Sequence, residues 1–152
     1  MECDVASYHI ESFNYLVDEG ADLAAKDVPP EKFRLPNGDA VELRYSGAVV
    51  EKPVLDGTEA SARRSTLSDS TVLLPAECRQ RGLTYRGNLR TAIEIHVNGV
   101  RQDTVETIIG QIPIMLKSNI CHLAEMSTTQ LLRAGEEATE RGGYFICKGT
   151  EK

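Results

Sequence analysis

The sequence contains no tryptophan and only three histidines, and its four cysteines lie far apart in the chain. They are Cys3, Cys78, Cys121 and Cys147, so no Cys-x-x-Cys pair is present. Zinc sites are usually built from such closely spaced ligands, and no metal site is therefore expected within this chain. Widely spaced cysteines without a secretory signal favour reduced thiols in a cytosolic or nuclear protein.

Long apolar runs are also missing. No segment approaches the roughly 18 apolar residues that a membrane span needs, and no apolar stretch typical of a secretory signal follows Met1. Neither a membrane contact nor secretion is indicated. The net charge of −6 means that the chain as a whole does not attract nucleic acid, although a local basic patch remains compatible with it.

The common catalytic motifs are absent. The sequence has no G-x-S-x-G, no P-loop, no H-E-x-x-H and no dinucleotide-binding glycine pattern. Cys121 and His122 are a thiol next to a potential base, but sequence neighbours rarely aim both side chains at one point. We therefore predict no catalytic residue in this chain.

The N-terminal half predicts one helix followed by strands. Apolar residues at helical spacing mark a helix over residues 9–26, with Gly20 as a weak point and Pro29-Pro30 as its end. Two β-rich runs flanking Ser46-Gly47 predict two short strands. Residues 56–70 are small, polar and charged, and we expect a flexible surface loop there.

Two hairpins are expected further along the chain. Apolar and polar residues alternate over 89–97, and Asn98-Gly99 then fits a type I′ turn. The closing stretch "GGYFICKGTEK" predicts a second hairpin that turns at Lys148-Gly149, although lysine is less suited than asparagine to a positive φ. A hairpin arm this short does not stabilise itself, so we expect the natural chain to continue beyond Lys152.

A second helix is predicted from Ser127, whose side chain can form a capping box with Gln130. This helix is expected to run to a C-terminal glycine at Gly142 and to expose an acidic face that carries Glu136, Glu137 and Glu140. Together these elements predict an α+β fold with a mixed sheet, hairpins and two main helices.

One segment departs from the acidic average. The stretch "CRQRGLTYRGNLR" contains Arg79, Arg81, Arg86 and Arg90 around Tyr85, with no acidic residue inside it. Arginines beside an aromatic ring are typical of surfaces that contact phosphates and bases. The alternative is that these arginines pair with carboxylates, such as Glu77 or Glu94, or with those of another subunit.

Three blocks carry a resemblance to a known family. They are "LLPAECRQRGLTYRGNL", "GQIPIMLKSNICHL" and "GGYFICKGTEK". In this order and spacing they resemble the N-terminal region of the second-largest subunit of cellular RNA polymerases. The opening "HIESFNYLVDEG", Arg86-Gly87 and Cys121-His122-Leu123 are most similar to the polymerase I class. The resemblance covers nearly the whole chain but is weak from 31 to 70, and Lys148 stands where the family usually has asparagine.

The resemblance implies that residues 1–152 are the first part of the protrusion domain, an α+β domain at the upstream rim of the DNA cleft. It implies a non-catalytic role in a DNA-directed RNA polymerase that makes ribosomal RNA precursor. Phosphate contacts are then expected from Arg79, Arg81, Arg86 and Lys117. Magnesium and zinc are implied for the full polymerase but outside this chain, which needs no cofactor of its own.

The resemblance also implies partners and a location. The partners are the largest subunit, the other polymerase I core subunits, the DNA template and initiation factors, in the nucleus and its nucleolus. Two alternatives stay open. The chain could be an interaction module for subunits or initiation factors without DNA contact, or the homologous segment of polymerase II or III.

Overall fold

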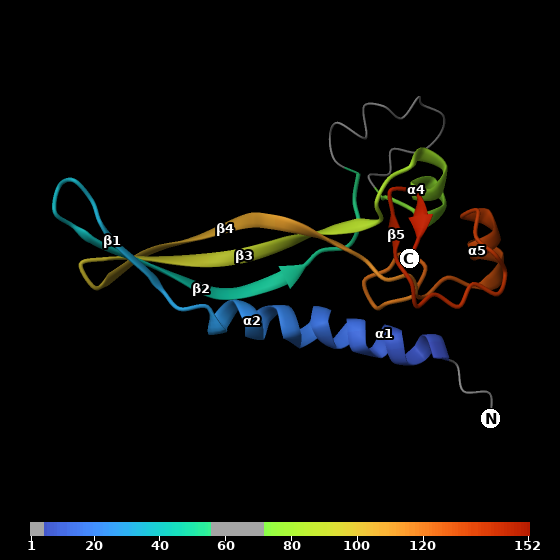
Figure 1. Ribbon diagram of the computed structural model, residues 1–152, viewed down its shortest axis with the longest axis horizontal. Helices are drawn as coiled ribbons and strands as arrows, with labels where there is room; N and C mark the ends of the chain where they lie inside the picture. Colours follow the sequence, from blue (N-terminus) through green and yellow to red (C-terminus); the bar gives the residue numbers. More distant parts are fainter. Residues whose placement is uncertain (1–4, 56–71) are drawn as a thin grey trace. The chain divides into compact units, whose positions relative to one another are not determined.

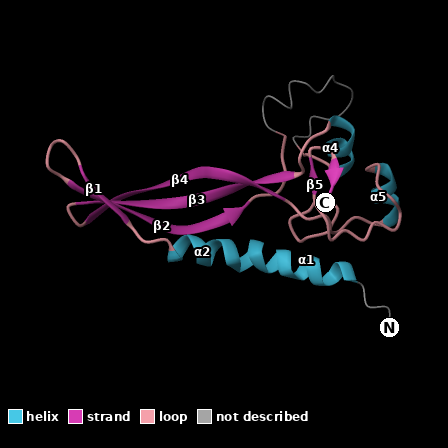
Figure 2. Ribbon diagram, in the orientation of Figure 1, coloured by secondary structure: helices cyan, strands magenta, loops and turns pink. Residues whose placement is uncertain are grey.

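The computed structural model describes residues 5–55 and 72–152 (Figure 1). The loop predicted over 56–70 lies outside the described residues. The chain divides into two compact units. We call residues 15–51 and 88–111 the sheet unit, and the remaining residues (1–14, 52–87 and 112–152) the core unit. The fold class is α+β, as predicted (Figure 2).

The first helical stretch begins at Val5 and changes its geometry in the middle. It consists of α1 (Val5–Tyr15), the π-helical segment η1 (Leu16–Gly20) and α2 (Ala21–Asp27). The N–H of Ala21 donates to the carbonyl of Leu16, five residues back, which is the π-helical bond. The helix ends where Val28 turns extended, two residues before Pro30, as the Pro29-Pro30 pair predicts. None of the described helices is long and apolar enough to cross a membrane.

The sheet unit is built on a four-stranded sheet in the order β1-β2-β3-β4. The strands are β1 (Glu31–Arg34), β2 (Ala40–Val50), β3 (Arg86–Val97) and β4 (Val100–Pro113). Asn98 and Gly99 link β3 to β4 with φ of 51° and 82°, so the predicted type I′ hairpin is confirmed. Helix α2 packs along β2 (Figure 1).

The prediction of two strands flanking Ser46-Gly47 is wrong, because β2 runs through this pair as one strand with a bulge. The pairing register with β3 shifts between Tyr45 and Gly47. The hydroxyl of Thr91 on β3 donates to the Gly47 carbonyl at 2.7 Å. A Cβ at Gly47 would lie 2.5 Å from Oδ1 of Asp22 on α2, so the helix approaches the bulge at a residue without a side chain.

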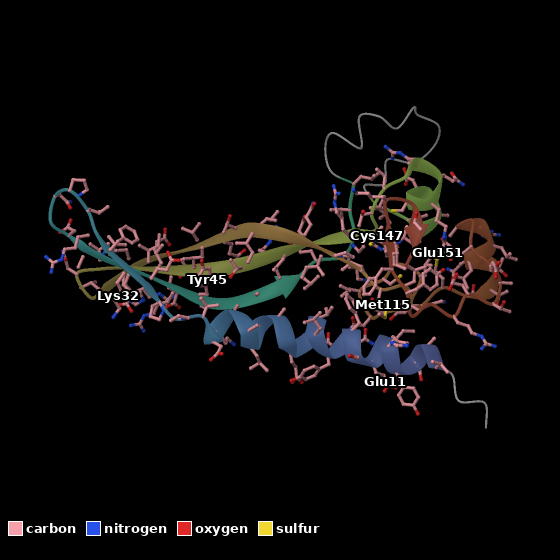
Figure 3. All side chains as sticks on the ribbon, in the orientation of Figure 1. Glu11, Lys32, Tyr45, Met115, Cys147 and Glu151 are labelled. Carbon is pink, nitrogen blue, oxygen red and sulfur yellow. The ribbon has the colours of Figure 1, made fainter. Side chains whose placement is uncertain are left out.

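The core unit has short elements joined by long irregular segments. They are α4 (Pro75–Arg81), α5 (Thr128–Arg133), β5 (Ile146–Cys147) and β6 (Thr150–Glu151). Tyr85 is fully buried among them, and its backbone N–H and C=O bond to Ile146 and Ile114. Met115, labelled in Figure 3, is buried in the same unit. The ring of Phe13 on α1 packs edge-on against Phe145.

The closing hairpin forms with lysine in its turn. Lys148 and Gly149 have φ of 52° and 78° and connect β5 to β6. The Lys148 N–H donates to the hydroxyl of Thr84 at 3.0 Å, and the Gly149 N–H donates to the carbonyl of Leu83 at 2.8 Å. These bonds to the chain that follows α4 offset the strain of a lysine at positive φ.

Candidate functional site

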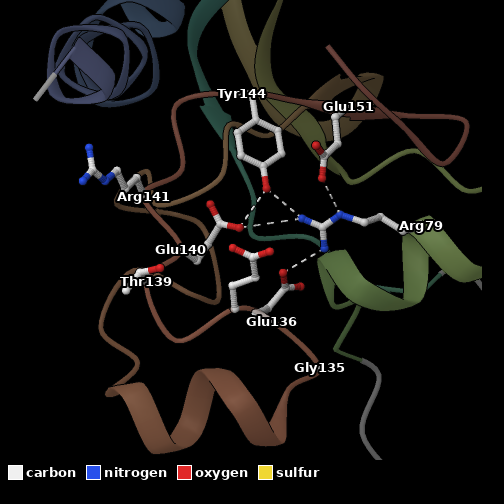
Figure 4. A pocket seen from close by; sticks show the side chains of 9 residues that line it. Arg79, Gly135, Glu136, Thr139, Glu140, Arg141, Tyr144 and Glu151 are labelled. Atoms are coloured by element: carbon white, nitrogen blue, oxygen red, sulfur yellow. Dashed lines mark hydrogen bonds and ion pairs between the residues drawn. The ribbon is translucent and has the colours of Figure 1, made fainter.

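Arg79 lies at the centre of the most connected charged cluster among the described residues. It is carried by α4, which starts with Pro75 in its first turn and ends at Gly82 in the left-handed conformation. All three nitrogens of its guanidinium group donate hydrogen bonds (Figure 4). They reach Oε1 of Glu151 at 2.9 Å, Oε2 of Glu136 at 2.8 Å and the hydroxyl of Tyr144 at 2.8 Å.

Glu136 reaches Arg79 because α5 is shorter than predicted. The helix ends at Arg133, and Gly135 takes a φ of 81°. The N–H groups of Gly135 and Glu136 bond back to the carbonyls of Leu132 and Leu131, which is the Schellman arrangement. The predicted exposed acidic helix up to Gly142 is therefore wrong.

The acidic residues after α5 take part in the cluster instead. The side chain of Glu136 is only 2% exposed and that of Glu140 only 10%. Glu140 accepts a hydrogen bond from the Tyr144 hydroxyl at 2.9 Å and one from the Gly142 N–H at 2.7 Å. Glu137 remains exposed, as predicted. The sequence did contain one signal for the shorter helix, because Gly135 is also a suitable C-terminal glycine.

The electrostatics of the cluster follow from its burial. Burial by itself would lower the pKa of the Arg79 guanidinium, but the hydrogen bond and charge of Glu136 outweigh it and raise that pKa. Burial, followed by the hydrogen bond to Glu140, also raises the pKa of the Tyr144 hydroxyl. Arg79 stays charged and Tyr144 stays neutral across the physiological pH range.

A hollow of about 630 Å³ opens beside this cluster. Its lining contains four carboxylates and two guanidinium groups, a net charge of −2. Nine residues line it: Arg79, Gly135, Glu136, Glu137, Thr139, Glu140, Arg141, Tyr144 and Glu151. Among the described residues, Oε1 of Glu136 is a buried oxygen without a hydrogen-bond partner. Such an atom is unusual in a folded protein.

The other predicted phosphate contacts have different surroundings. Arg81 donates to Glu77, four residues earlier on α4, at 2.7 Å. The ammonium group of Lys117 donates to the carbonyl of Leu123 at 3.0 Å. Arg86 is half-buried at the start of β3. All four residues belong to the core unit, and their contact with DNA stays a prediction.

Arg79 and Arg81 pair with carboxylates in this structure, as the alternative interpretation of the arginine-rich segment expects. Glu77, which pairs with Arg81, is one of the two carboxylates named for this alternative. Glu94 instead lies in the sheet unit, where Arg101 is 3.2 Å from its carboxylate. Arg90 pairs with Glu51 at 2.6 Å in the same unit.

The side chains of Cys121 and His122 have different partners. The Tyr85 hydroxyl contacts Sγ of Cys121 at 3.5 Å and accepts the backbone N–H of His122 at 3.0 Å. The imidazole of His122 bonds to the carbonyl of Pro53 at 2.6 Å. Burial, and then the neighbouring Cys121, raise the pKa of Tyr85, so its hydroxyl stays protonated. This network joins three chain segments of the core unit.

Residues 4–152 match the family model described as RNA polymerase beta subunit. A DNA-directed RNA polymerase I subunit RPA2 homolog of Caenorhabditis elegans is 55% identical over 152 residues, which are 100% of this chain and 13% of that protein. The DNA-directed RNA polymerase I subunit RPA2 of Homo sapiens is 38% identical over 144 residues, or 95% of this chain and 12% of that protein. The probable RPA2 subunit of Schizosaccharomyces pombe is 34% identical over 155 residues, again 95% of this chain and 13% of that protein. The chain thus spans about an eighth of these relatives.

Proposed function

The chain belongs to the RNA polymerase beta subunit family, and we propose that it works as the N-terminal segment of the second-largest subunit of RNA polymerase I. The observation that carries this proposal is the 55% identity to the nematode relative across the whole chain. The assembled enzyme transcribes ribosomal RNA precursor from a DNA template. Within it this segment is the first part of the protrusion and shapes the upstream rim of the DNA cleft.

The segment contributes structure to the enzyme and takes no part in the reaction itself. Nucleotidyl transfer by polymerases is metal-assisted. In the part of the chain that the structure describes, no group of three or more His, Cys, Asp or Glu side chains is placed to hold a metal ion. We assign the magnesium ligands to the largest subunit and the zinc site to the chain beyond residue 152.

The proposed DNA contacts are Arg79, Arg81, Arg86 and Lys117. Arg79 differs from the others because all three of its guanidinium nitrogens already donate within the core unit. A phosphate that binds Arg79 competes with carboxylates that already accept from it. Glu151 is the most exposed of the three carboxylates that Arg79 meets, with 57% of its side chain exposed, and is therefore the one that a phosphate displaces most easily.

The salt dependence of DNA binding by the assembled polymerase tests these contacts. Each lysine or arginine that neutralises a phosphate contributes about one unit to the slope of log affinity against log salt concentration. Arg81→Ala, Arg86→Ala and Lys117→Ala should each lower the slope by about one unit. Arg133→Ala, a change on the exposed part of α5, serves as the control and should leave the slope unchanged.

A second candidate function is a protein-interaction module that binds a subunit or initiation factor without touching DNA. The pairing of Arg79 and Arg81 with carboxylates favours it, since these cations are then neutralised before any DNA arrives. Unchanged slopes in all the variants would contradict the DNA contacts. Loss of a subunit or factor from the purified variant enzymes would then support the interaction module.

The partners and location follow from the same proposal. The segment assembles with the largest subunit and the other core subunits, and initiation factors dock on the finished complex. It is localised to the nucleus, and within the nucleus to the nucleolus. Fluorescence microscopy of the tagged full-length subunit beside a nucleolar marker tests the location, and a diffuse cytoplasmic signal would contradict it.

A further inference from the structure

The four-stranded sheet is covered along one side and open along the other. On the side of β2, the short strand β1 pairs with residues 40–43, and the N–H of Ala48 donates to Oδ1 of Asp22 on α2 at 3.3 Å. On the opposite side β4 is the last strand, and no described strand pairs with its outer edge (Figure 1). The sheet unit therefore covers the edge of β2 and leaves the edge of β4 available.

The outer edge of β4 lacks the features that most often prevent pairing. Every second residue of an antiparallel strand directs its N–H and C=O away from its neighbour, so the 14 residues of β4 present several such groups. Natural edge strands are commonly short, or they carry lysine or proline. β4 contains no lysine, and its one proline is its last residue, Pro113. The backbone of β4 can therefore accept another strand.

Large apolar side chains lie along the second half of this edge. Val105, Ile108 and Ile109 are 44%, 48% and 54% exposed. Successive side chains of a strand point to opposite faces, so Ile108 and Ile109 lie on different faces of the sheet. A strand added beside β4 would contact both of them, whereas a helix laid on the sheet would reach one face only. The distribution of apolar surface therefore favours an extended occupant.

The charge of the unit indicates the chemistry of that occupant. The sheet unit contains eleven Asp and Glu residues but only six Lys and Arg residues, a net charge of −5. Glu106 is exposed among the apolar residues of β4. Arg90, whose charge interacts with that of Glu106, already pairs with Glu51 at 2.6 Å. A lysine or arginine opposite Glu106, with apolar residues beside it, is therefore favoured in the added strand.

We propose that β4 accepts an extended segment of another polymerase subunit, which pairs along residues 105–110 and places a lysine or arginine opposite Glu106. The inference rests on the proposed assembly of the chain into RNA polymerase I. An apolar edge that is left open can pair with any other chain, so it needs cover at all times. A stably bound subunit supplies such cover, whereas a factor that binds transiently does not. Main-chain hydrogen bonds provide the affinity, and the apolar and basic side chains provide the selectivity.

Site-specific crosslinking in the purified, assembled polymerase tests the pairing. p-Benzoylphenylalanine at Val105 and, in a second enzyme, at Ile109 should crosslink on irradiation to the same segment of another subunit. The two positions are about 13 Å apart along a strand, so the crosslinked residues of that segment should lie about four residues apart. A helix covers the same length with about nine residues. Mass spectrometry of the crosslinked peptides measures this spacing.

The positional control is the same photoreactive residue at Phe33, which is 45% exposed on β1 at the other side of the sheet. It should not crosslink to that segment.

Charge reversal then tests the chemistry by hydrogen exchange of the β4 amides in the assembled enzyme. Glu106→Lys places like charges opposite each other and should speed the exchange of residues 105–110 about threefold to fivefold, once intrinsic rates are removed. Glu19→Lys makes the same change in net charge at an exposed position on η1 and should leave this exchange unchanged.

Four results would overturn the inference. They are the absence of a crosslink from both positions, a crosslink only to the second-largest subunit itself, a spacing other than about four residues, and exchange that Glu106→Lys does not speed. A second-largest subunit that does not copurify with the other polymerase subunits would contradict the proposed function together with this inference. Unchanged salt slopes of DNA binding would instead overturn the DNA contacts alone.

Discussion

The two units differ in how regular secondary structure relates to burial. The sheet unit contains the long strands β2, β3 and β4, whereas the core unit has helices and strands of at most a few turns or residues, apart from α1. Yet twelve of the fifteen buried apolar side chains among the described residues belong to the core unit. The sheet unit contributes only Val41, Ala48 and Val50.

The sheet unit also exposes large apolar side chains. Val49 is 62% exposed, and Ile108 and Ile109 on β4 are 48% and 54% exposed. Its hydrogen-bonded ladders satisfy the backbone, but they do not remove this surface from water. The comparison shows that a sequence can form long, regular strands without burying many apolar side chains.

The largest expected effect is in the core unit. Tyr85→Ala should lower the free energy of unfolding by about 3–5 kcal/mol, because it opens a cavity and removes the partner of the His122 N–H. Tyr15→Ala, the same change at a side chain that is 58% exposed in the sheet unit, is the control. Urea unfolding of both variants measures the difference, and equal losses would break the comparison.

Glycine substitutions sharpen the comparison. Gly142→Ala should destabilise by about 3 kcal/mol, since φ is 72° and the new Cβ would clash with the carbonyl oxygen of Leu116. Gly38→Ala in the sheet unit has a φ of 95° but no atom within 4 Å of the new Cβ. It should therefore show only the conformational cost of about 1–2 kcal/mol. Thermal unfolding should rank the two variants in this order.

The stability of the sheet unit is expected to depend on pH. The hydrogen bond from Arg90 lowers the pKa of Glu51 from its usual value of 4.5. A carboxyl group whose pKa is lower in the folded than in the unfolded state stabilises the fold at pH values above its unfolded-state pKa. This contribution disappears as the pH falls through the folded-state pKa. An exposed pair of this kind contributes about 0.2–1 kcal/mol.

Hydrogen exchange of the β2 and β3 amides between about pH 6 and about pH 3 measures this contribution once intrinsic exchange rates are removed. Glu51→Gln should flatten the pH dependence. Glu137→Gln in the core unit, which changes an exposed carboxylate, should not alter it. A pH dependence that survives in Glu51→Gln would contradict the assignment.

The smallest effect is expected on the exposed side chains of β4. Ile108→Thr should change the free energy of unfolding by no more than about 0.5 kcal/mol, because the side chain is already 48% exposed. Ile114→Thr, at a fully buried position in the core unit, is the matched change and should be far more disruptive. A large loss from Ile108→Thr would show that β4 packs more tightly than its exposure indicates.

Local signals made much of the sheet unit predictable. Pro29-Pro30 marked the end of the first helix, and Asn98-Gly99 marked the turn between β3 and β4. Both pairs could be read from the sequence because these residues set the backbone dihedral angles at or next to their own positions. The bulge at Gly47 was missed because its partner Thr91 lies 44 residues away. A run of residues cannot reveal which strand will pair with it.

The candidate site was less predictable for the same reason. The arginine-rich segment and the capping box at Ser127 were visible in the sequence, and the structure has that box. The partners of Arg79 were not visible, since Glu136 and Glu151 follow it by 57 and 72 residues. Choosing Gly142 rather than Gly135 as the end of α5 placed Glu136 on an exposed face, although its side chain is buried.

The π-helical segment Leu16–Gly20 adds one residue to the first helix without changing the face that α2 presents to β2. A π-turn contains one more residue than an α-turn while both of its ends stay hydrogen-bonded. Deleting one residue here would return the segment to α-helical geometry, and Asp22 would keep accepting the Ala48 N–H, which is 3.3 Å away. The same deletion in an α-helical turn would rotate the residues beyond it by about 100°. The π-turn is therefore the place where the first helix can lose one residue of length without losing its packing against β2.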